Sequence, residues 1–318
     1  MRTTLLIIMF FCAAVASAQP YPSRPVRLIV PFPAGSTPDI VGRALGQKLA
    51  EAWGQPVVVD NRPGAGANIG TAEVARATPD GYTLLIGSNG PIAINKALYA
   101  NLPFDPERDL KPLSLLAAAP QILAVHPSVP ANDLKQLVAY ARANPGKLSY
   151  GSVGSGSASH LTMELFKSQA RVSLVHVPYK GFPPVVQDLL SGRLHATFAI
   201  VPAVLPQIRA GRLKALAVTS EQRTPLAPDI ATVSEQGFPH FDATAWQGLL
   251  GPAEIPSDAA EVIARETQKA MQTRGVRELL EKQGFVVIGS SPQFFENFIR
   301  AEREKWTKVV RETGARAE

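Results

Sequence analysis

Short apolar runs alternate along the chain with segments in which apolar residues recur at helical spacing. The run at residues 27–32 predicts a strand, and Val41, Leu45 and Leu49 then line one face of a predicted helix. Because apolar run, loop and helical segment repeat in this order, the pattern predicts an α/β protein with mostly parallel sheets. Further strands are predicted at residues 57–59, 83–86, 122–125, 174–177, 196–201 and 215–218.

Polar residues indicate where the predicted helices begin. Thr37 is a good N-cap for the first helix, and Pro38 is a good first helical residue. Asn132 is expected to cap a helix that ends at residues 143–146, and another helix is expected over residues 160–167. Each of these helices would follow directly on a strand and its loop.

The order of strand, loop and helix starts again in the middle of the chain, and the pattern changes once more near residue 240. A stretch at residues 243–250 is followed by two predicted helices, the last of which starts at Ser291 and is strongly amphipathic. We therefore predict two domains joined by more than one crossing of the chain. Domain I is expected to comprise residues 19–122 and 240–318, and domain II residues 123–239.

The N-terminus has the composition of a secretion signal. Arg2 gives a positive start, residues 5–15 are apolar, and Ala-Ser-Ala at residues 16–18 fits an A-x-A cleavage site. We therefore expect residues 1–18 to be a signal peptide. A transmembrane anchor fits less well, because about 14 apolar residues are fewer than the ~20 that span a bilayer. A lipoprotein acylated at Cys12 also fits less well, because bulky residues precede this cysteine.

Composition excludes several other classes of protein. Hydrophobic residues make up 46% and charged residues 18% of the 318 residues, which excludes a mainly disordered chain. The single cysteine lies in the expected signal peptide, so the exported protein would have neither a disulfide bond nor thiol chemistry. The net charge of +6 is not gathered into runs, and we expect no nucleic-acid partner.

The sequence carries few marks of an enzyme. None of the five histidines forms an H-E-x-x-H pair, so we expect no metal site. A G-x-S-x-G motif is absent, although a Ser/His/Asp triad assembled from distant residues is not excluded. Gly64, Gly66 and Gly70 resemble a dinucleotide-binding fingerprint, but the third glycine lies one position too late. We therefore expect no cofactor.

Two loops rich in glycine and hydroxyl residues, at 33–39 and 151–159, precede predicted helices in different halves of the chain. The start of a helix offers unpaired backbone N–H groups and a partial positive charge, while glycine lets an anion approach the backbone. Two such loops facing each other across a cleft would hold a small carboxylate. The other interpretation is that both are ordinary capped turns between a strand and a helix. On these residues alone, both interpretations stay open.

Seven segments, in order along nearly the whole chain, carry motifs of a known family. One is Leu-Ile-Val-Pro-Phe-Pro-Ala-Gly at residues 28–35, followed by Asp39, and another is Gly-Ser-Val-Gly-Ser-Gly-Ser-Ala-Ser-His-Leu at residues 151–161. The others lie at residues 61–70, 79–85, 176–181, 213–219 and 246–252. In this combination the chain resembles the Bug family, the periplasmic solute receptors of tripartite tricarboxylate transport systems.

The resemblance implies a two-domain periplasmic binding protein fold, hinged by crossing strands, with the ligand held in the cleft. It implies capture of a small organic carboxylate for the membrane permease subunits of a tripartite tricarboxylate-type transporter, without an enzymatic reaction. We expect a periplasmic monomer. The ligand-binding residues carried over from the family motifs are Phe32, Ala34, Gly35, Ser36, Thr37, Ser88, Asn89, Ser152, Gly154, Ser155, Gly156, Ser157, His160, Tyr179, Lys180 and Gly181.

The chain departs from the family pattern in two places. Ser36 stands where the first loop usually has a second glycine, and Phe-Pro-Pro at residues 182–184 stands where small residues are common. The identity of the carboxylate therefore cannot be copied from a relative. Two other functions stay open: an exported hydrolase with a dispersed triad, and a subunit that presents its ligand to a sensor kinase.

Overall fold

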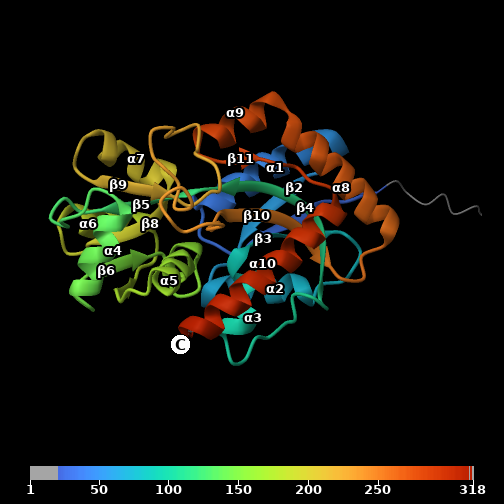
Figure 1. The fold of residues 1–318 in the computed structure, drawn as a ribbon. Coiled ribbons are helices and arrows are strands. Elements are labelled where there is room, and N and C mark those ends of the chain that lie inside the picture. The colour runs from blue at the N-terminus through green and yellow to red at the C-terminus, as the bar shows by residue number, and fades with distance from the viewer. Residues whose placement is uncertain (1–20, 315, 317–318) are drawn as a thin grey trace, which may run out of the picture.

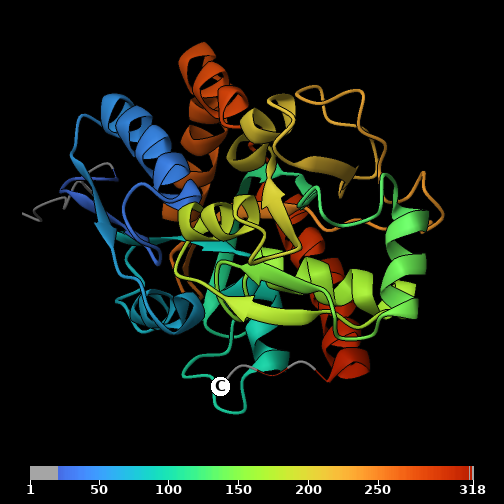
Figure 2. The ribbon, with the colours of Figure 1, turned by 90° about the vertical axis from the view of Figure 1, so that its left-hand side faces the viewer.

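The structure of the protein is a computed structural model that describes residues 21–314 and 316. The expected signal peptide, with Cys12, lies outside the described residues. Two β-sheets, each covered by helices, lie side by side in Figure 1, with the first sheet and its helices on the right. The second sheet and its helices face the viewer in Figure 2.

The first sheet has the strand order β11-β4-β10-β3-β1-β2. Strand β1 pairs in parallel with β2 and β3, whereas β10 pairs antiparallel with both β3 and β4. The short β11 pairs antiparallel with β4 at the edge. The strands are β1 (Val26–Val30), β2 (Val57–Asn61), β3 (Thr83–Ser88), β4 (Leu110–Ala119), β10 (Ala245–Pro252) and β11 (Val286–Val287).

The second sheet has the strand order β7-β6-β8-β5-β9. Strand β6 pairs in parallel with β7 and β8, and β5 pairs antiparallel with β8 and β9. The strands are β5 (Gln121–Val125), β6 (Ser149–Ser152), β7 (Val175–Pro178), β8 (Ala196–Ile200) and β9 (Lys214–Val218).

The α/β class is confirmed, and each sheet is mixed: most of its strands run in one direction, and a minority run against them. Apart from the short edge strand β11, the strands that run against the others are β5 and β10, which the chain forms directly after crossing from the other sheet. Their direction is therefore set by the crossing and not by a strand–helix–strand unit, whose strands would be parallel. Sequence patterns predict strand–helix–strand units well, but they do not show where the chain crosses from one sheet to the other.

Helices cover both sheets, and two apolar clusters pack against the two faces of the first sheet. One cluster joins that sheet to α1, α8 and α9, and the other joins it to α10 and reaches α5 of the second domain. The longer helices are α1 (Thr37–Trp53), α2 (Asn68–Ala75), α4 (Leu134–Ala143), α5 (Ala158–Ala170), α6 (Phe182–Leu190), α7 (Val201–Arg209), α8 (Ser257–Gln272), α9 (Arg274–Lys282) and α10 (Pro292–Thr313). Three shorter turns are η1 (Ala65–Ala67), η2 (Gly90–Ile94) and α3 (Asn95–Leu98).

Several predicted helix ends are wrong by one or two residues. Ser36, not Thr37, occupies the N-cap of α1. Asp133, not Asn132, caps α4, because its carboxylate accepts a hydrogen bond from the Gln136 N–H at 2.7 Å. Helix α2 was not predicted. Three C-terminal helices are present where two were predicted, because the break between α8 and α9 was not recognised.

The chain crosses between the sheets twice, and the two crossings are hydrogen-bonded to each other. Only Pro120 separates β4 from β5, while residues 219–244 lead from β9 to β10. The Gln121 N–H donates to Thr219 Oγ1 at 2.9 Å, and the Gln121 amide donates to the Ala243 carbonyl at 3.1 Å. The sheets are therefore joined at one narrow point. The domain boundaries given above stay a prediction.

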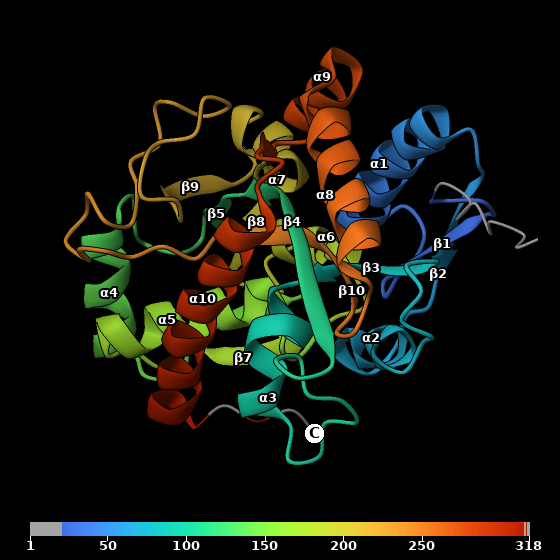
Figure 3. The ribbon, with the colours of Figure 1, turned by 90° about the vertical axis from the view of Figure 1, so that its right-hand side faces the viewer.

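Helix α10 reaches both parts of the molecule. It contacts β4, η2 and α3 of the first domain and α5 of the second. In Figure 3 it runs between α5 and α3 along one side of the molecule. The loops that follow β3 and β6 approach each other, since a Cβ added at Gly90 would lie 3.3 Å from the Gly156 carbonyl oxygen. Loops at the carboxyl ends of parallel strands are where α/β sheets usually bind ligands.

Candidate functional site

A buried aspartate holds the first loop in place at the start of α1. Asp39 Oδ2 accepts hydrogen bonds from the Gly35 N–H and from Arg43 Nε, both at 2.9 Å, and Oδ1 accepts one from Asn61 Nδ2 at 2.9 Å. Burial alone would raise the pKa of the Asp39 carboxyl, but the hydrogen bonds from Arg43, Gly35 and Asn61 outweigh it and lower that pKa. A charged Asp39 therefore fixes the backbone of residues 32–37.

Helix α1 brings this loop to the carboxyl end of β3. A Cβ added at Gly42 of α1 would lie 3.0 Å from a methyl group of Val30 and 3.2 Å from Ile86, so α1 packs closely on β1 and β3. Ser88 shares the face of Ile86, because side chains two residues apart point to the same side of a strand. The N-terminus of α1 and Ser88 thus lie at the same edge of the sheet.

Two buried polar atoms near this edge lack a hydrogen-bond partner within the described chain. One is the hydroxyl of Ser36, which occupies the N-cap of α1 without bonding to the helix. The other is Oε1 of Gln247, a side chain that is 4% exposed. Gln247 of β10 lies directly opposite Ser88 in the antiparallel pair, so both side chains are on the face covered by α1. Buried polar atoms without partners are rare in proteins.

Asn89 has a different environment from Ser88. Its Oδ1 accepts a hydrogen bond from the Trp246 N–H at 2.9 Å, and its Nδ2 donates to the Thr244 carbonyl at 3.1 Å and to Glu302 Oε2 at 3.4 Å. Glu302 also accepts hydrogen bonds from the indoles of Trp246 and Trp306, at 2.9 and 3.0 Å. The Asn89 amide is therefore engaged in joining β3 and β10 to α10.

The glycine- and serine-rich loop of the second domain satisfies many of its own hydrogen-bonding groups. The Gly154 N–H donates to Ser152 Oγ at 3.2 Å, and Ser157 Oγ donates to the Gly154 carbonyl at 2.6 Å. The Val153 N–H donates to Ser159 Oγ at 3.1 Å. These contacts are those of a capped turn. Ser155 is half-buried at the tip of the loop and makes no hydrogen bond within the described residues.

Behind this loop, His160 and His176 form a stack with Tyr150. The imidazole centroids of the two histidines are 4.1 Å apart, and the ring of Tyr150 lies 4.9 Å from that of His176. His160 Nδ1 accepts a hydrogen bond from the Gly156 N–H at 3.1 Å. Burial, with the nearby His176, lowers the pKa of His160 to about 4, and burial also lowers the pKa of His176. Both imidazoles are thus neutral near pH 7.

The Tyr179–Gly181 segment lies beside the same loop. The Tyr179 N–H donates to the Ser152 carbonyl at 2.9 Å, and its hydroxyl donates to Asp188 Oδ2 at 2.7 Å. Burial and the Asp188 carboxylate raise the pKa of Tyr179 to about 12. Lys180 is exposed, and Gly181 precedes α6, whose first turn holds Pro183. Because proline lacks an N–H, this helix start has fewer donors for an anion than most.

Gly156 brings the loop of the second domain against the first domain. A Cβ at Gly156 would lie 2.9 Å from Leu98 Cδ2 and 3.3 Å from Asn95 Oδ1, and a Cβ at Gly90 would lie 3.3 Å from the Gly156 carbonyl oxygen. Asn95 is fully buried and donates to Asn68 Oδ1 at 2.6 Å, while its Oδ1 has no partner in the described part of the chain. Asn95 therefore lies at the contact between the two domains.

Asn95 and Gln247 are absent from the residues predicted above. Gln247 is a single polar residue inside a long apolar strand, and it lies within one of the family segments, so its position was a usable signal. Asn95 directly follows the apolar residues 91–94, and nothing in the sequence shows that this run ends at the other domain. The role of each side chain in the site depends on contacts between parts of the chain that are distant in sequence.

Neither a metal-binding cluster nor a histidine hydrogen-bonded to both a serine and a carboxylate is found in the part of the chain that the structure describes. Across residues 21–314 and 316, no group of three or more His, Cys, Asp or Glu side chains could hold a metal ion. Ser152 Oγ and His176 Nε2 are 2.6 Å apart, but no carboxylate within those residues is hydrogen-bonded to His176, and Ser152 is fully buried. None of the described helices is both long and apolar enough for a membrane span.

Comparison with known proteins identifies relatives along nearly the whole chain. Residues 41–315 match the model of a family described as the tripartite tricarboxylate transporter family receptor. Protein BugT of Bordetella pertussis is 38% identical over 305 residues, which cover 96% of this chain and 94% of BugT.

Solved structures share the fold at similar identity. R. palustris Rpa4515 with adipate has a TM-score of 0.84 and 35% identity, covering 92% of this chain and 98% of that one. MatC from Rhodopseudomonas palustris with bound malate has a TM-score of 0.82 and 30% identity, covering 91% and 100%. The periplasmic binding protein BugD has a TM-score of 0.81 and 31% identity, covering 94% and 100%.

These comparisons confirm both the two-domain periplasmic binding protein fold and the resemblance to the Bug proteins. The matched region runs from α1 to the end of α10 and so includes elements of both domains. The chain therefore belongs to the family of tripartite tricarboxylate transporter receptors.

Proposed function

We propose that the protein is a periplasmic receptor that holds a small dicarboxylate between its two domains and catalyses no reaction. The observation that carries this proposal is a pair of buried, unpartnered polar atoms: Ser36 Oγ at the N-terminus of α1 and Gln247 Oε1 on β10, opposite Ser88. The relatives Rpa4515 and MatC, which bind adipate and malate, supply the class of ligand.

A carboxylate fits this position because it accepts hydrogen bonds and carries a negative charge. The first turn of α1 supplies backbone N–H groups and the positive end of the helix dipole, and Ser36 adds a hydroxyl donor. The amide of Gln247 offers an N–H donor when it is turned over, since its oxygen and nitrogen ends have nearly the same shape. Asp39 keeps the loop in the conformation that this contact needs.

The second carboxylate would be held by the second domain. Ser155 at the tip of its loop and the exposed Lys180 beside it are available, whereas Ser152 and Ser157 are engaged within the loop. Proline in the first turn of α6 leaves few N–H groups at that helix start. We therefore assign the main contact in this domain to Ser155 and Lys180, with Gly156 and Asn95 bringing the two domains together.

The place and partners of the protein follow from the family and from the expected signal peptide. Export across the inner membrane would leave a monomeric receptor in the periplasm. It would deliver its carboxylate to the membrane permease subunits of a tripartite tricarboxylate-type transporter.

Calorimetric titration with linear dicarboxylates and neutral sugars tests the proposal. Dicarboxylates of the size of malate to adipate are expected to bind and sugars are not, and binding should weaken below about pH 4 as the ligand is protonated. Gln247→Met, which keeps the size of the side chain but removes its polar atoms, is expected to weaken binding tenfold or more.

A matched control is Thr267→Val in α8, because Thr267 is also buried with an unpartnered oxygen but lies in another part of the domain. This variant should bind like the wild type. Binding of a sugar without binding of any dicarboxylate would contradict the proposal. Wild-type affinity in Gln247→Met would remove Gln247 from the site.

A further inference from the structure

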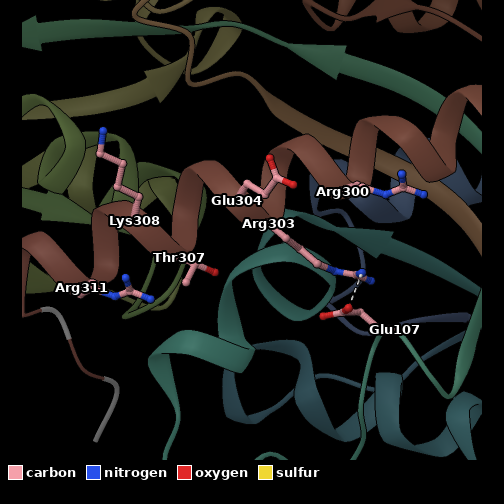
Figure 4. Close-up of a pocket in the computed structure, with 7 residues that line it drawn as sticks. All are labelled: Glu107, Arg300, Arg303, Glu304, Thr307, Lys308 and Arg311. Carbon is pink, nitrogen blue, oxygen red and sulfur yellow. Dashed lines mark ion pairs between the residues drawn. The ribbon is translucent and has the colours of Figure 1, made fainter.

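One side of α10 forms a groove lined mainly by cationic side chains, outside the contact between the domains. Arg300, Arg303, Thr307 and Arg311 recur every three or four residues and so lie along one side of the helix. Together with Glu107, Glu304 and Lys308 they line a hollow of about 350 Å³. Figure 4 shows these side chains projecting from α10, with Glu107 reaching Arg303 from a neighbouring segment.

The groove continues toward the C-terminal end of the helix. A second hollow of about 390 Å³ shares Thr307 and Arg311 with the first and adds Arg316. Ala97 of α3 and Val310 of α10 give this part an apolar wall. From residue 300 to residue 311 the helix alone extends the groove over about 16 Å, at 1.5 Å per residue.

The cations of the groove have only loose ion pairs within the protein. Arg300 lies 3.7 Å from Glu296, Lys308 lies 3.9 Å from Glu312, and Arg303 lies 3.6 Å from Glu107. These separations exceed hydrogen-bonding distance. The pairs of Arg300 and Lys308 are exposed and contribute little, whereas Arg303 is half-buried. Among the described residues, Arg311 has no ion pair, and it is exposed.

One of the two glutamates that line the groove has its charge partly neutralised by a neighbouring cation. Glu107 lies 3.2 Å from Lys96 Nζ, so its charge is shared with a cation outside the groove. The groove is therefore net positive even though Glu107 and Glu304 line it. A net positive, concave surface attracts carboxylates, and the positions of its charges fix the register in which an acidic partner binds.

We propose that this groove binds an extended acidic segment of a partner protein, with carboxylates on alternate residues. A 16 Å groove matches about five extended residues. Their alternate side chains are about 7 Å apart, so three carboxylates fit between Arg300 and Arg311. A single small dicarboxylate would fill only a fraction of this length. The glutamates among the cations and the apolar wall favour a defined segment of protein over the flat surface of an anionic membrane.

The test uses the full protein and a fluorescent peptide with Glu at alternate positions. Fluorescence anisotropy at low salt is expected to show binding, and the same peptide with Gln in place of Glu should not bind. The double variant Arg300→Glu with Arg311→Glu is expected to weaken binding at least tenfold, or about 1.4 kcal/mol. Arg303 is left intact because its Nε donates to the Ile92 carbonyl of η2 at 3.1 Å and supports the fold.

A matched control is Arg265→Glu with Arg274→Glu. These arginines lie on α8 and α9, are exposed, and form ion pairs within their own helices, so the change in net charge is the same. This control should bind the peptide within twofold of the wild type. A peptide with Lys in place of Glu is expected to bind the Arg300→Glu, Arg311→Glu protein better than the wild type, because only direct contact gives this rescue. Melting temperatures of both variants show that they are folded.

Four outcomes would overturn the proposal. The first is that the Glu peptide fails to bind the wild type, and the second is that both double variants lose the same amount of peptide affinity. The third is that adipate displaces the peptide at equal carboxylate concentration. The fourth is that the protein does not bind the peptide but sediments with phosphatidylglycerol vesicles in a charge-dependent way. The third would assign the groove to small anions and the fourth to a membrane surface. The proposal stands apart from the dicarboxylate site, since these measurements need no bound dicarboxylate.

Discussion

Gly156→Ala tests whether the close approach of the two domains is needed for binding. Gly156 has φ of +79°, a conformation that costs other residues about 1–2 kcal/mol. Its new Cβ would also lie 2.9 Å from Leu98 Cδ2 and 3.3 Å from Asn95 Oδ1, both in the first domain. The backbone strain is present whether the domains are together or apart, whereas the clash arises only when they are together. Stability and ligand affinity should therefore fall for different reasons.

The magnitudes follow from these two terms. Overpacking costs about 1–3 kcal/mol, so dicarboxylate affinity should fall by about tenfold or more, since 1.4 kcal/mol corresponds to a factor of ten. Gly156→Val should weaken binding further. Gly146→Ala is the matched control, because Gly146 has φ of +72° in the same domain but no atom within 4 Å of the added Cβ. It should lose stability to a similar extent and keep wild-type affinity.

The assay is calorimetric titration with a dicarboxylate, together with thermal unfolding of the same samples. Gly156→Ala is expected to show both losses and Gly146→Ala only the loss of stability. A folded Gly156→Ala protein with wild-type affinity would refute the reasoning, because it would show that the loop does not approach the first domain when ligand is bound.

Three further predictions concern stability. Gly248→Ala should lower it by about 3 kcal/mol in chemical denaturation, because the added Cβ would lie 2.0 Å from the buried ring of Phe295, whereas Gly275→Ala, with no atom within 4 Å, should not destabilise. The free energy of unfolding should fall as pH drops from about 6.5 toward 4, because His160 is neutral in the folded protein and protonated in the unfolded chain. His160→Asn keeps a hydrogen-bond acceptor for the loop and should make stability depend less on pH. An unchanged pH dependence in this variant would contradict the assignment. Asp39→Asn should lower the melting temperature near pH 7. The difference in melting temperature from the wild type should shrink as pH falls through the lowered pKa of Asp39, because the wild type then loses the stabilising charge of this carboxyl. A difference that does not change with pH would show that charge is not the cause.

The sequence predicted the elements of the fold better than their pairing. Apolar runs located most strands because a strand buried on both faces has few polar positions. They did not show that β5 and β10 run antiparallel to their neighbours, because that direction depends on where the chain crosses between sheets. The helix starts were misplaced where two capping residues are adjacent, as with Ser36 and Thr37.

Of the candidate site, the sequence located the loops but not how their polar groups are used. Ser152 and Asn89 were predicted to face the ligand, yet their hydrogen bonds to His176 and Trp246 are made with residues far along the chain. Asn95 was missed for the same reason, since a buried amide without a hydrogen-bond partner is recognised only in the folded structure, whereas Gln247 could have been noticed as a lone polar residue in an apolar strand. Whether the predicted loop residues contact the ligand stays a prediction.

A crystal structure of the protein with a bound dicarboxylate tests the central claim most directly. The account predicts one carboxylate within hydrogen-bonding distance of Ser36 Oγ and the Gln247 amide, at the N-terminus of α1, with the loop of Gly156 packed against Asn95. A ligand bound elsewhere, with Ser36 and Gln247 still lacking polar partners, would contradict it.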